Sequence, residues 1–162
     1  MEYPTHDPVI PNFHLDDSTV EYTSVMLRQL VSMEYVLYVK LQNFHWNVTG
    51  WNFYSLHQFF GQQYEELGKF IDRIAEQIRK YGRAAPGAMQ EFIQNSLGLE
   101  ERPGVLLDAQ SMVAVSLSDH EAIVTYLNSL QPNMLDLATQ NLLGEILDWH
   151  MKYAWMLRAH QE

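Results

Sequence analysis

Several features are absent from this sequence, and each absence excludes a class of protein. No cysteine occurs among the 162 residues, so neither a disulfide nor a thiolate metal site is possible. No Lys or Arg precedes Arg28, and the first residues lack the basic and apolar segments of a signal peptide. No run approaches the roughly 20 consecutive apolar residues that a membrane-spanning helix needs. We therefore expect a cytoplasmic protein that does not enter a membrane.

Positive charge is also scarce. The chain has ten Lys and Arg residues and twenty Asp and Glu residues, which gives a formal net charge of −10. Binding to nucleic acid draws on basic side chains that displace counterions from phosphates, so this balance argues against a general DNA-binding protein. An acidic surface attracts cations instead. With 47% hydrophobic and 19% charged residues, the composition is typical of one globular domain.

The chain divides into a short tail and a helical domain. Residues 1–17 contain prolines and acidic residues but no basic residue, which predicts an extended acidic tail before a domain over 18–162. Ser18 and Glu21 have the spacing of a capping box and predict a helix start there. Apolar residues then recur at steps of three and four up to Phe44, and Gly50 is expected to end this helix.

Three further long helices follow. The second is expected between Asn52 and Tyr81, where one apolar stripe runs without interruption and Gly82 provides the stop. A short helix fits 87–96, a third long helix begins near Leu106, and residues 131–133 separate it from a fourth that begins near Leu135. With no strand pattern, the fold class is all-α. We predict a four-helix bundle with a short extra helix in the crossover between helices two and three.

Imidazole and carboxylate side chains along the first two helices form the main candidate site. His45, His57, Asp72 and Glu76 offer nitrogen and oxygen ligands that suit Fe, Mn or Zn. Asp72 and Glu76 are four residues apart, so they share one face of a helix. The spacing alone is also compatible with a histidine beside the core and two solvated carboxylates. Both interpretations stay open at this point.

If the four residues form one site, two chains must build it. Asp72 follows His57 by fifteen residues on the same predicted helix, which is about 22 Å at the standard rise. Gly61, Gly68 and Ala75 lie on the same flank and would let the equivalent helix of a second subunit approach around a twofold axis. No Glu is followed three residues later by His, so we expect no iron at the centre of the bundle.

The sequence resembles the Dps family of mini-ferritins. The resemblance covers roughly residues 20–160 and is carried by LQNFHWNVTGWNFYSLH at 41–57, YEEL at 64–67, IDRIAEQIR at 71–79, GRAAPG at 82–87, DHEAIV at 119–124 and WMLRAH at 155–160. It implies a ferritin-like bundle that assembles into a hollow dodecamer in the cytoplasm of a bacterium or archaeon. It also implies ferroxidase centres at twofold interfaces, with His45 and His57 from one subunit and Asp72 and Glu76 from its neighbour.

The resemblance further implies a chemistry. Members of this family oxidise Fe(II), preferentially with hydrogen peroxide, and store the ferric mineral, which suppresses hydroxyl radicals under oxidative stress. Iron is then the expected metal, with Zn²⁺ or Mn²⁺ as substitutes. Trp46 would be an aromatic neighbour of the metal, which we interpret as interface packing with redox contact as a by-product.

The chain departs from the family pattern at Gly61, where the family has Asp or Glu. A water molecule or Glu65, one turn further, would have to replace that ligand. At the expected threefold pore Asp136 matches the pattern, Asn141 replaces an acid, and Glu145 would restore the charge. Two rival hypotheses remain: a structural DNA-compacting shell, against which the tail without Lys or Arg argues, and a shell whose metal site is degenerate because of Gly61.

Overall fold

The computed structural model describes residues 11–161, so ten residues of the predicted tail lie outside the described part of the chain. The described residues form five α-helices and one short 3-10 helix, and they contain no strand. The bounds are α1 (Asp17–Asn47), α2 (Phe53–Lys80), α3 (Met89–Asn95), α4 (Ala109–Ser129), η1 (Pro132–Met134) and α5 (Leu137–Ala159). The all-α prediction is therefore confirmed.

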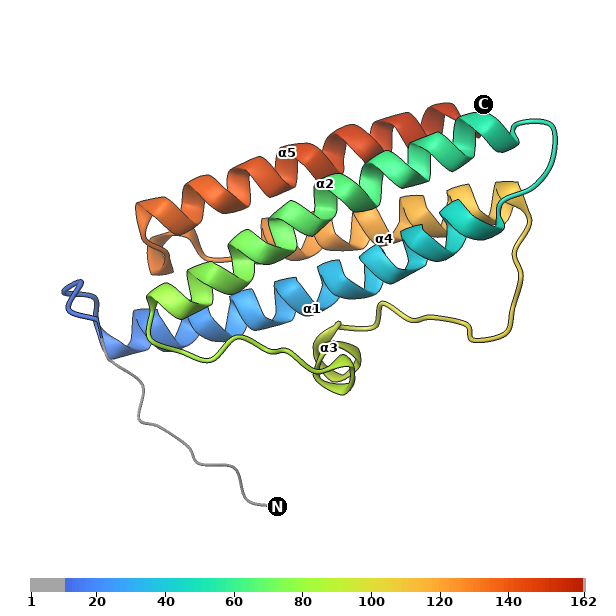
Figure 1. The fold of residues 1–162 in the computed structure, drawn as a ribbon. Helices are drawn as coiled ribbons and strands as arrows, with labels where there is room; N and C mark the ends of the chain where they lie inside the picture. Colours follow the sequence, from blue (N-terminus) through green and yellow to red (C-terminus); the bar gives the residue numbers. More distant parts are fainter. Residues whose placement is uncertain (1–10, 162) are drawn as a thin grey trace, which may run out of the picture.

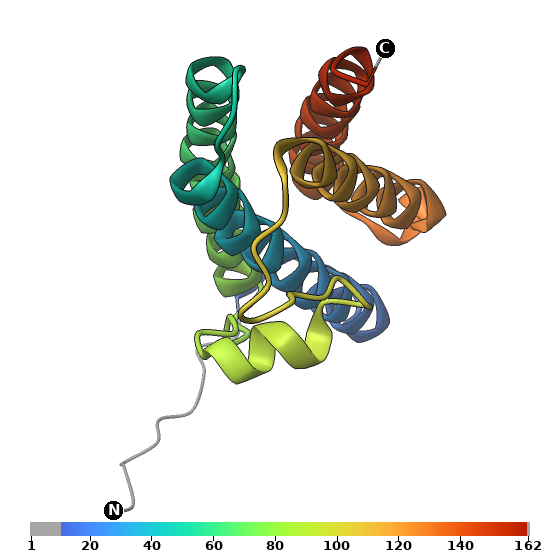
Figure 2. The same cartoon turned by 90° about the vertical axis from the view of Figure 1, so that its right-hand side faces the viewer.

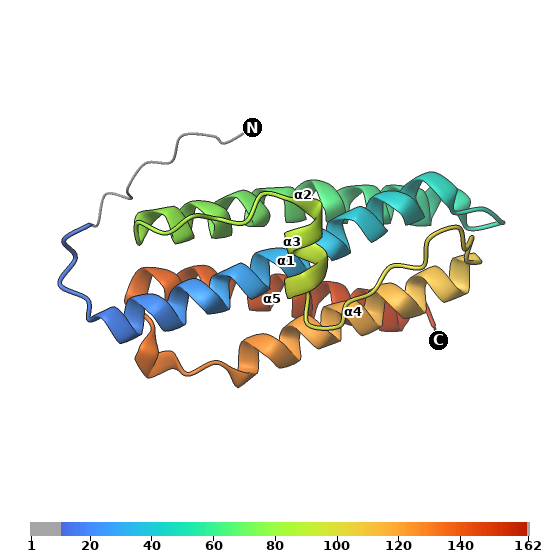
Figure 3. The ribbon, with the colours of Figure 1, turned by 90° about the horizontal axis from the view of Figure 1, so that it is seen from below.

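The four long helices form a bundle of two antiparallel hairpins. Helices α1 and α2 lie side by side, as do α4 and α5 (Figure 1). Seen along the bundle, the two hairpins are separate pairs (Figure 2). The crossover from α2 to α4 runs along the bundle from one end to the other (Figure 1). The short helix α3 lies across α1 within this crossover, as predicted (Figure 3).

Apolar residues of all four long helices meet in one core. Most of the stripe predicted for α2 is buried, because the side chains of Leu56, Phe60, Leu67, Ile74 and Ile78 are fully inaccessible, although Phe53 at its start is exposed. A helix with a single apolar stripe gains most of its stability by burying that stripe against other helices. No helix in residues 11–161 has the length and hydrophobicity required to cross a membrane.

The helix starts differ in detail from the prediction. The N-cap of α1 is Asp16, two residues before the predicted cap, and its side chain accepts a hydrogen bond from the backbone N–H of Thr19 at 2.8 Å. Ser18 is therefore not the N-cap. Glu21 does not complete a capping box, since its carboxylate pairs with Arg83 at 3.5 Å. Asn52 precedes α2 as predicted, but its side chain makes no capping hydrogen bond.

The second half of the bundle starts slightly later than predicted. Helix α4 begins at Ala109, behind Asp108, whose carboxylate accepts from the N–H of Ser111 at 2.7 Å. Helix α5 begins at Leu137 behind Asp136. In both cases an aspartate satisfies N–H groups that have no partner within the first turn of a helix.

Candidate metal centre

The hairpin between α1 and α2 brings His45 and His57 together. His45 lies in the last turn of α1 and His57 near the start of α2. Their imidazole rings stack with centroids 3.8 Å apart and planes inclined by 18°. Both residues are half-buried. The pair of imidazoles predicted from the sequence is therefore present within a single chain.

Two reciprocal hydrogen bonds fix the orientation of these rings. Nδ1 of His45 lies 2.6 Å from the carbonyl oxygen of His57, and Nδ1 of His57 lies 2.7 Å from the carbonyl oxygen of His45. A carbonyl oxygen only accepts, so each Nδ1 must carry the proton. Each Nε2 then keeps its lone pair in the neutral ring, and neither Nε2 has a hydrogen-bond partner within residues 11–161. Hydrogen bonding at one ring nitrogen is the usual way in which proteins prepare the other as a metal ligand.

Gly61 provides the space that the imidazole of His45 occupies. A Cβ atom at Gly61 would lie 2.9 Å from Nδ1 and 3.0 Å from Cε1 of His45. At Gly68, two turns further along α2, an added Cβ would lie 3.5 Å from the ring of Tyr38. The close approach at these glycines thus comes from side chains of α1 in the same chain. The helix of a second subunit, which the sequence suggested, is not needed to explain them.

The candidate carboxylates are well separated from the histidines. Asp72 and Glu76 are exposed on α2, and neither has a hydrogen bond or ion pair within residues 11–161. The neighbouring Arg73 pairs with Glu145 at 2.7 Å rather than with either of them. Over the described residues, no group of three or more His, Asp or Glu side chains is arranged to hold a metal ion. Within one chain, the two histidines and the two carboxylates therefore do not form a single metal site.

The other predicted participants lie on the surface of the single chain. Glu65 is exposed on α2. Trp46 is 68% exposed beside His45, and Trp51, in the hairpin, is 98% exposed. Isolated exposed apolar residues are normal, but both indoles lie in the segment that joins His45 to His57.

Both residues predicted to line a pore have partners inside the chain. Asp136 caps α5 through the N–H groups of Ala138 and Thr139, and its other oxygen contacts the hydroxyl of Tyr81. Partial burial raises the pKa of Asp136, but hydrogen bonds from Tyr81 and Thr139 outweigh this, and the net shift is downward. The hydrogen bond from Arg73 lowers the pKa of Glu145. These contacts account for both carboxylates, and their part in a pore stays a prediction.

A buried polar chain at the bundle centre was not predicted. It links one residue from each long helix: Glu34, Gln63, His120 and His150, all fully inaccessible. Nε2 of His120 lies 2.9 Å from Oε1 of Gln63, the two histidine Nδ1 atoms are 2.9 Å apart, and Nε2 of His150 lies 2.9 Å from Oε1 of Glu34.

The proton arrangement in this chain follows from its acceptors. The amide oxygen of Gln63 accepts from Nε2 of His120, so Nδ1 of neutral His120 accepts from Nδ1 of His150. One remaining proton is shared between His150 and Glu34. The pKa of His120 lies well below its ordinary value, mainly because the side chain is buried and to a lesser extent because His150 lies beside it. His120 is therefore neutral. The sequence pattern indicates that Glu34 is buried, because it lies between Leu30 and Leu37 at a position of the apolar stripe of α1.

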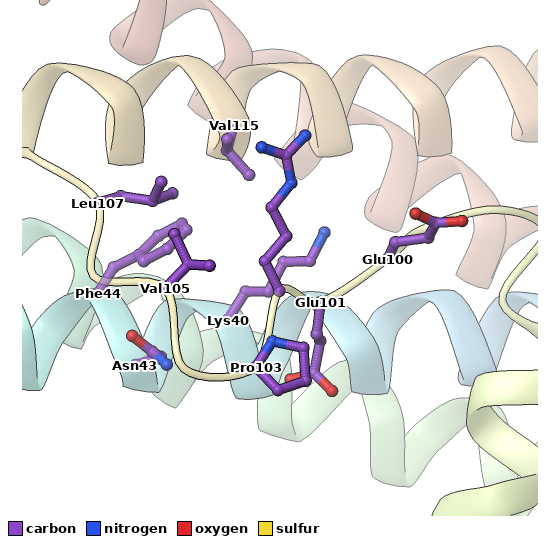
Figure 4. A pocket seen from close by; sticks show the side chains of 10 residues that line it. Lys40, Asn43, Phe44, Glu100, Glu101, Pro103, Val105, Leu107 and Val115 are labelled. Carbon is purple, nitrogen blue, oxygen red and sulfur yellow. The ribbon is translucent and has the colours of Figure 1, made fainter.

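A separate hollow of about 270 Å³ lies between α1, α4 and the crossover (Figure 4). Lys40 and Phe44 line it from α1, and Val115 lines it from α4. The ammonium of Lys40 is paired with the buried carboxylate of Asp119 at 2.8 Å. None of the four candidate ligands lines this hollow.

Comparison with known proteins gives consistent matches along most of the chain. The family model described as a ferritin-like domain matches residues 25–162. A low temperature-induced protein of Nostoc is 34% identical over 155 residues, which cover 93% of this chain and 86% of that protein. The DNA protection during starvation protein of Brevibacillus brevis is 32% identical over 148 residues, or 90% of this chain and 98% of that protein. The crystal structure of a Dps protein from Bacillus brevis has a TM-score of 0.84 at 32% identity and covers 91% of this chain and all of that one.

Proposed function

Because the chain belongs to the Dps family of ferritin-like proteins, we propose that it oxidises ferrous iron with hydrogen peroxide and stores the ferric product inside a dodecameric shell. Iron storage and protection against oxidative stress are the general functions of this family. The oxidant, the assembly state and the ligands named below are our proposals for this chain.

The observation that carries the proposal is the oriented pair of imidazoles. His45 and His57 each donate Nδ1–H to a backbone carbonyl and leave Nε2 without a partner in the chain. Neutral imidazole nitrogen together with carboxylate oxygen is a ligand set that suits iron, and also zinc and manganese. A histidine pair held only for packing would have no need of this reciprocal arrangement.

The carboxylates would come from a neighbouring copy. Asp72 and Glu76 lie about 22 Å and about 28 Å along α2 from His57 at the standard helical rise, so they cannot reach the histidines of their own chain. A twofold axis that pairs α2 with α2 of a second copy would bring each carboxylate pair to the opposite histidine pair. The exposed indoles of Trp46 and Trp51 would then be covered by the partner.

The chemistry then requires the protein to hold ferrous iron and to pass its electrons to peroxide. Reduction of one peroxide molecule to two water molecules takes two electrons and two protons, which two ferrous ions and the solvent supply. Carboxylates stabilise the ferric product because they are hard anionic ligands. The acidic balance of the chain, −10 overall, favours entry of cations.

The proposal is tested by anaerobic titration with Fe(II), followed by rapid mixing with either peroxide or dioxygen. We expect saturable binding of iron and much faster oxidation by peroxide than by dioxygen. His57→Ala should abolish the fast phase, whereas His14→Ala, which removes a histidine remote from the site, should not. Peroxide oxidation no faster than in protein-free solution would contradict the proposal and favour a degenerate site.

A further inference from the structure

The buried polar chain at the bundle centre joins the two hairpins of the fold. Glu34 and Gln63 belong to the α1–α2 hairpin, whereas His120 and His150 belong to the α4–α5 hairpin (Figure 2). Two of its three hydrogen bonds cross between the hairpins, from His120 to Gln63 and between His150 and Glu34, each at 2.9 Å. Separation of the hairpins must therefore break both of these hydrogen bonds.

This polar chain has no place for an additional proton. Nε2 of His120 donates to Gln63 and Nδ1 of His120 accepts from His150, so neutral His120 uses both of its ring nitrogens. A proton added to Nδ1 of His120 would face the N–H of His150, and the hydrogen bond between the two rings, now 2.9 Å long, would be lost. Burial, and then the neighbouring His150, hold the pKa of His120 well below its ordinary 6.5.

The charged groups that flank the imidazoles are engaged with other partners. Asp119, next to His120 on α4, is paired with Lys40 of α1 at 2.8 Å. Glu66 of α2 accepts a hydrogen bond from the hydroxyl of Tyr153 on α5 at 3.0 Å. Burial raises the pKa of Tyr153 above its ordinary value, so this phenol stays neutral. A second positive charge on the imidazoles would therefore remain unbalanced in the closed bundle.

Glu34 makes the closed state less stable than a fully satisfied chain would be. Its Oε1 shares one proton with His150, whereas its Oε2 is buried and has no hydrogen-bond partner in the described part of the protein. A buried acceptor without a partner is costly, and exposure to water removes that cost. Opening of the bundle therefore relieves Glu34 at the same time as it lets the imidazoles bind protons.

We propose that these four side chains form an acid-sensitive link between the hairpins, which holds the bundle closed near neutral pH and lets the hairpins separate in mild acid. The closed link holds one proton, shared between His150 and Glu34. Opening exposes both imidazoles to water, where each binds a proton below about pH 6.5 while the carboxylate is ionised. Opening therefore takes up one proton per chain, and its equilibrium constant should rise up to about tenfold for each pH unit below about 6.5. The inference does not depend on the iron chemistry proposed above.

Two substitutions change the number of protons that opening takes up. Glu34→Gln removes the shared proton, and its amide can donate to Nε2 of His150, so the closed link stays neutral and opening takes up two protons. His120→Gln removes one imidazole, so the remaining His150 holds one proton in both states and opening takes up none. His14→Gln is the control, because His14 is exposed and lies before the first helix of the bundle.

Amide hydrogen exchange of the metal-free full-length protein, followed by mass spectrometry between about pH 5 and about pH 8, gives the opening constant for peptides of α4 and α5 once the intrinsic pH dependence of exchange is removed. Below about pH 6.5 we expect a rise of up to about tenfold per pH unit in wild type and His14→Gln, up to about a hundredfold in Glu34→Gln, and no rise in His120→Gln.

An opening constant of wild type that stays the same below about pH 6.5 would overturn the inference. Equal pH dependence in wild type and Glu34→Gln would overturn it as well, and this comparison decides the matter if His120→Gln does not fold. Because the protein is free of metal in this experiment, either outcome leaves the proposed iron oxidation untouched.

Discussion

At Gly61 the backbone of α2 lies directly against the imidazole of His45, so this residue decides how the histidine pair is held. An added methyl group would approach Nδ1 of His45 to 2.9 Å, and the same nitrogen donates to the carbonyl of His57 at 2.6 Å. Movement of the ring would therefore disturb the hydrogen bond and the stacking together. Gly68 offers a matched comparison, because an added Cβ there makes an ordinary contact at 3.5 Å.

Gly61→Ala should destabilise the protein and weaken iron binding. Overpacking costs about 1–3 kcal/mol, which exceeds the gain of up to about 1 kcal/mol from replacing a helical glycine by alanine. Gly68→Ala should show only the gain. The thermal unfolding midpoint and anaerobic binding of Fe(II) measure both effects. A Gly61→Ala protein as stable as Gly68→Ala, with unchanged binding of iron, would contradict the packing role of Gly61.

At the residue scale, the sequence predicted the ligand types but not all of their neighbours. The short spacing of His45 and His57 in the sequence is enough to bring them together, because one hairpin joins their helices. Glu34 and His150 are 116 positions apart, and only the assembly of the whole bundle makes them hydrogen-bond partners. No local pattern encodes such a contact. The absence of Glu-x-x-His motifs was a correct observation, but it did not anticipate the buried histidine chain at the centre of the bundle.

At the element scale, hydrophobic periodicity predicted the helices well and their first residues less well. The continuous stripe of α2 gave its limits to within a residue. For α1, Ser18 and Asp16 both had the chemistry of a cap. Asp16 prevails because its carboxylate accepts from the backbone N–H of Thr19 and from the hydroxyl groups of Ser18 and Thr19. Competing caps two residues apart are not distinguished by composition alone.

The cap of α1 should make stability depend on pH in the acid range. Hydrogen bonds from Ser18 and then Thr19 lower the pKa of the Asp16 carboxyl from its ordinary 3.8 to about 2. A carboxyl with a lowered folded-state pKa stabilises the fold above the unfolded pKa, and this contribution disappears as pH falls through the folded pKa. Asp16→Ala should therefore melt at a lower temperature than wild type at neutral pH, with the difference shrinking below about pH 3.8.

Asp17→Ala is the control for this cap, since Asp17 lies in the first turn without serving as the N-cap. Circular dichroism melts of wild type and both variants between neutral pH and about pH 2 give the comparison. A difference between wild type and Asp16→Ala that stays constant across the acid range would mean that the ionised carboxylate is not the stabilising group.

At the scale of the whole molecule, charge sets the expected partners. The net charge of −10 and the absence of Lys or Arg before Arg28 leave little basic surface for phosphate contacts. Association driven by release of counterions should therefore be negligible. We expect no gel shift of duplex DNA at sub-micromolar protein in moderate salt without divalent cations. A clear shift under those conditions, weakened by added salt, would show that a basic surface forms on assembly and would revive the DNA-compacting hypothesis.

The proposed metal site is the feature that a single chain leaves incomplete. Sequence spacing predicted that His57 and the carboxylates cannot meet within one helix, and in residues 11–161 no group of three or more His, Asp or Glu side chains comes together. The geometry of the second copy could not be predicted, because it depends on surfaces such as Trp46 and Trp51 whose partners are on another molecule. The central claim is therefore that two copies share each site.

Subunit mixing tests this claim most directly. His57→Ala and Asp72→Ala should each lack fast iron oxidation, because each damages both sites of a twofold pair. After dissociation and joint reassembly, about half of the pairs are mixed, and each mixed pair has one site with both ligands intact, so about a quarter of wild-type activity should return. Native mass spectrometry confirms the mixing. Recovery near that level is the result we predict, and confirmed mixed pairs without any recovered activity would contradict the shared site.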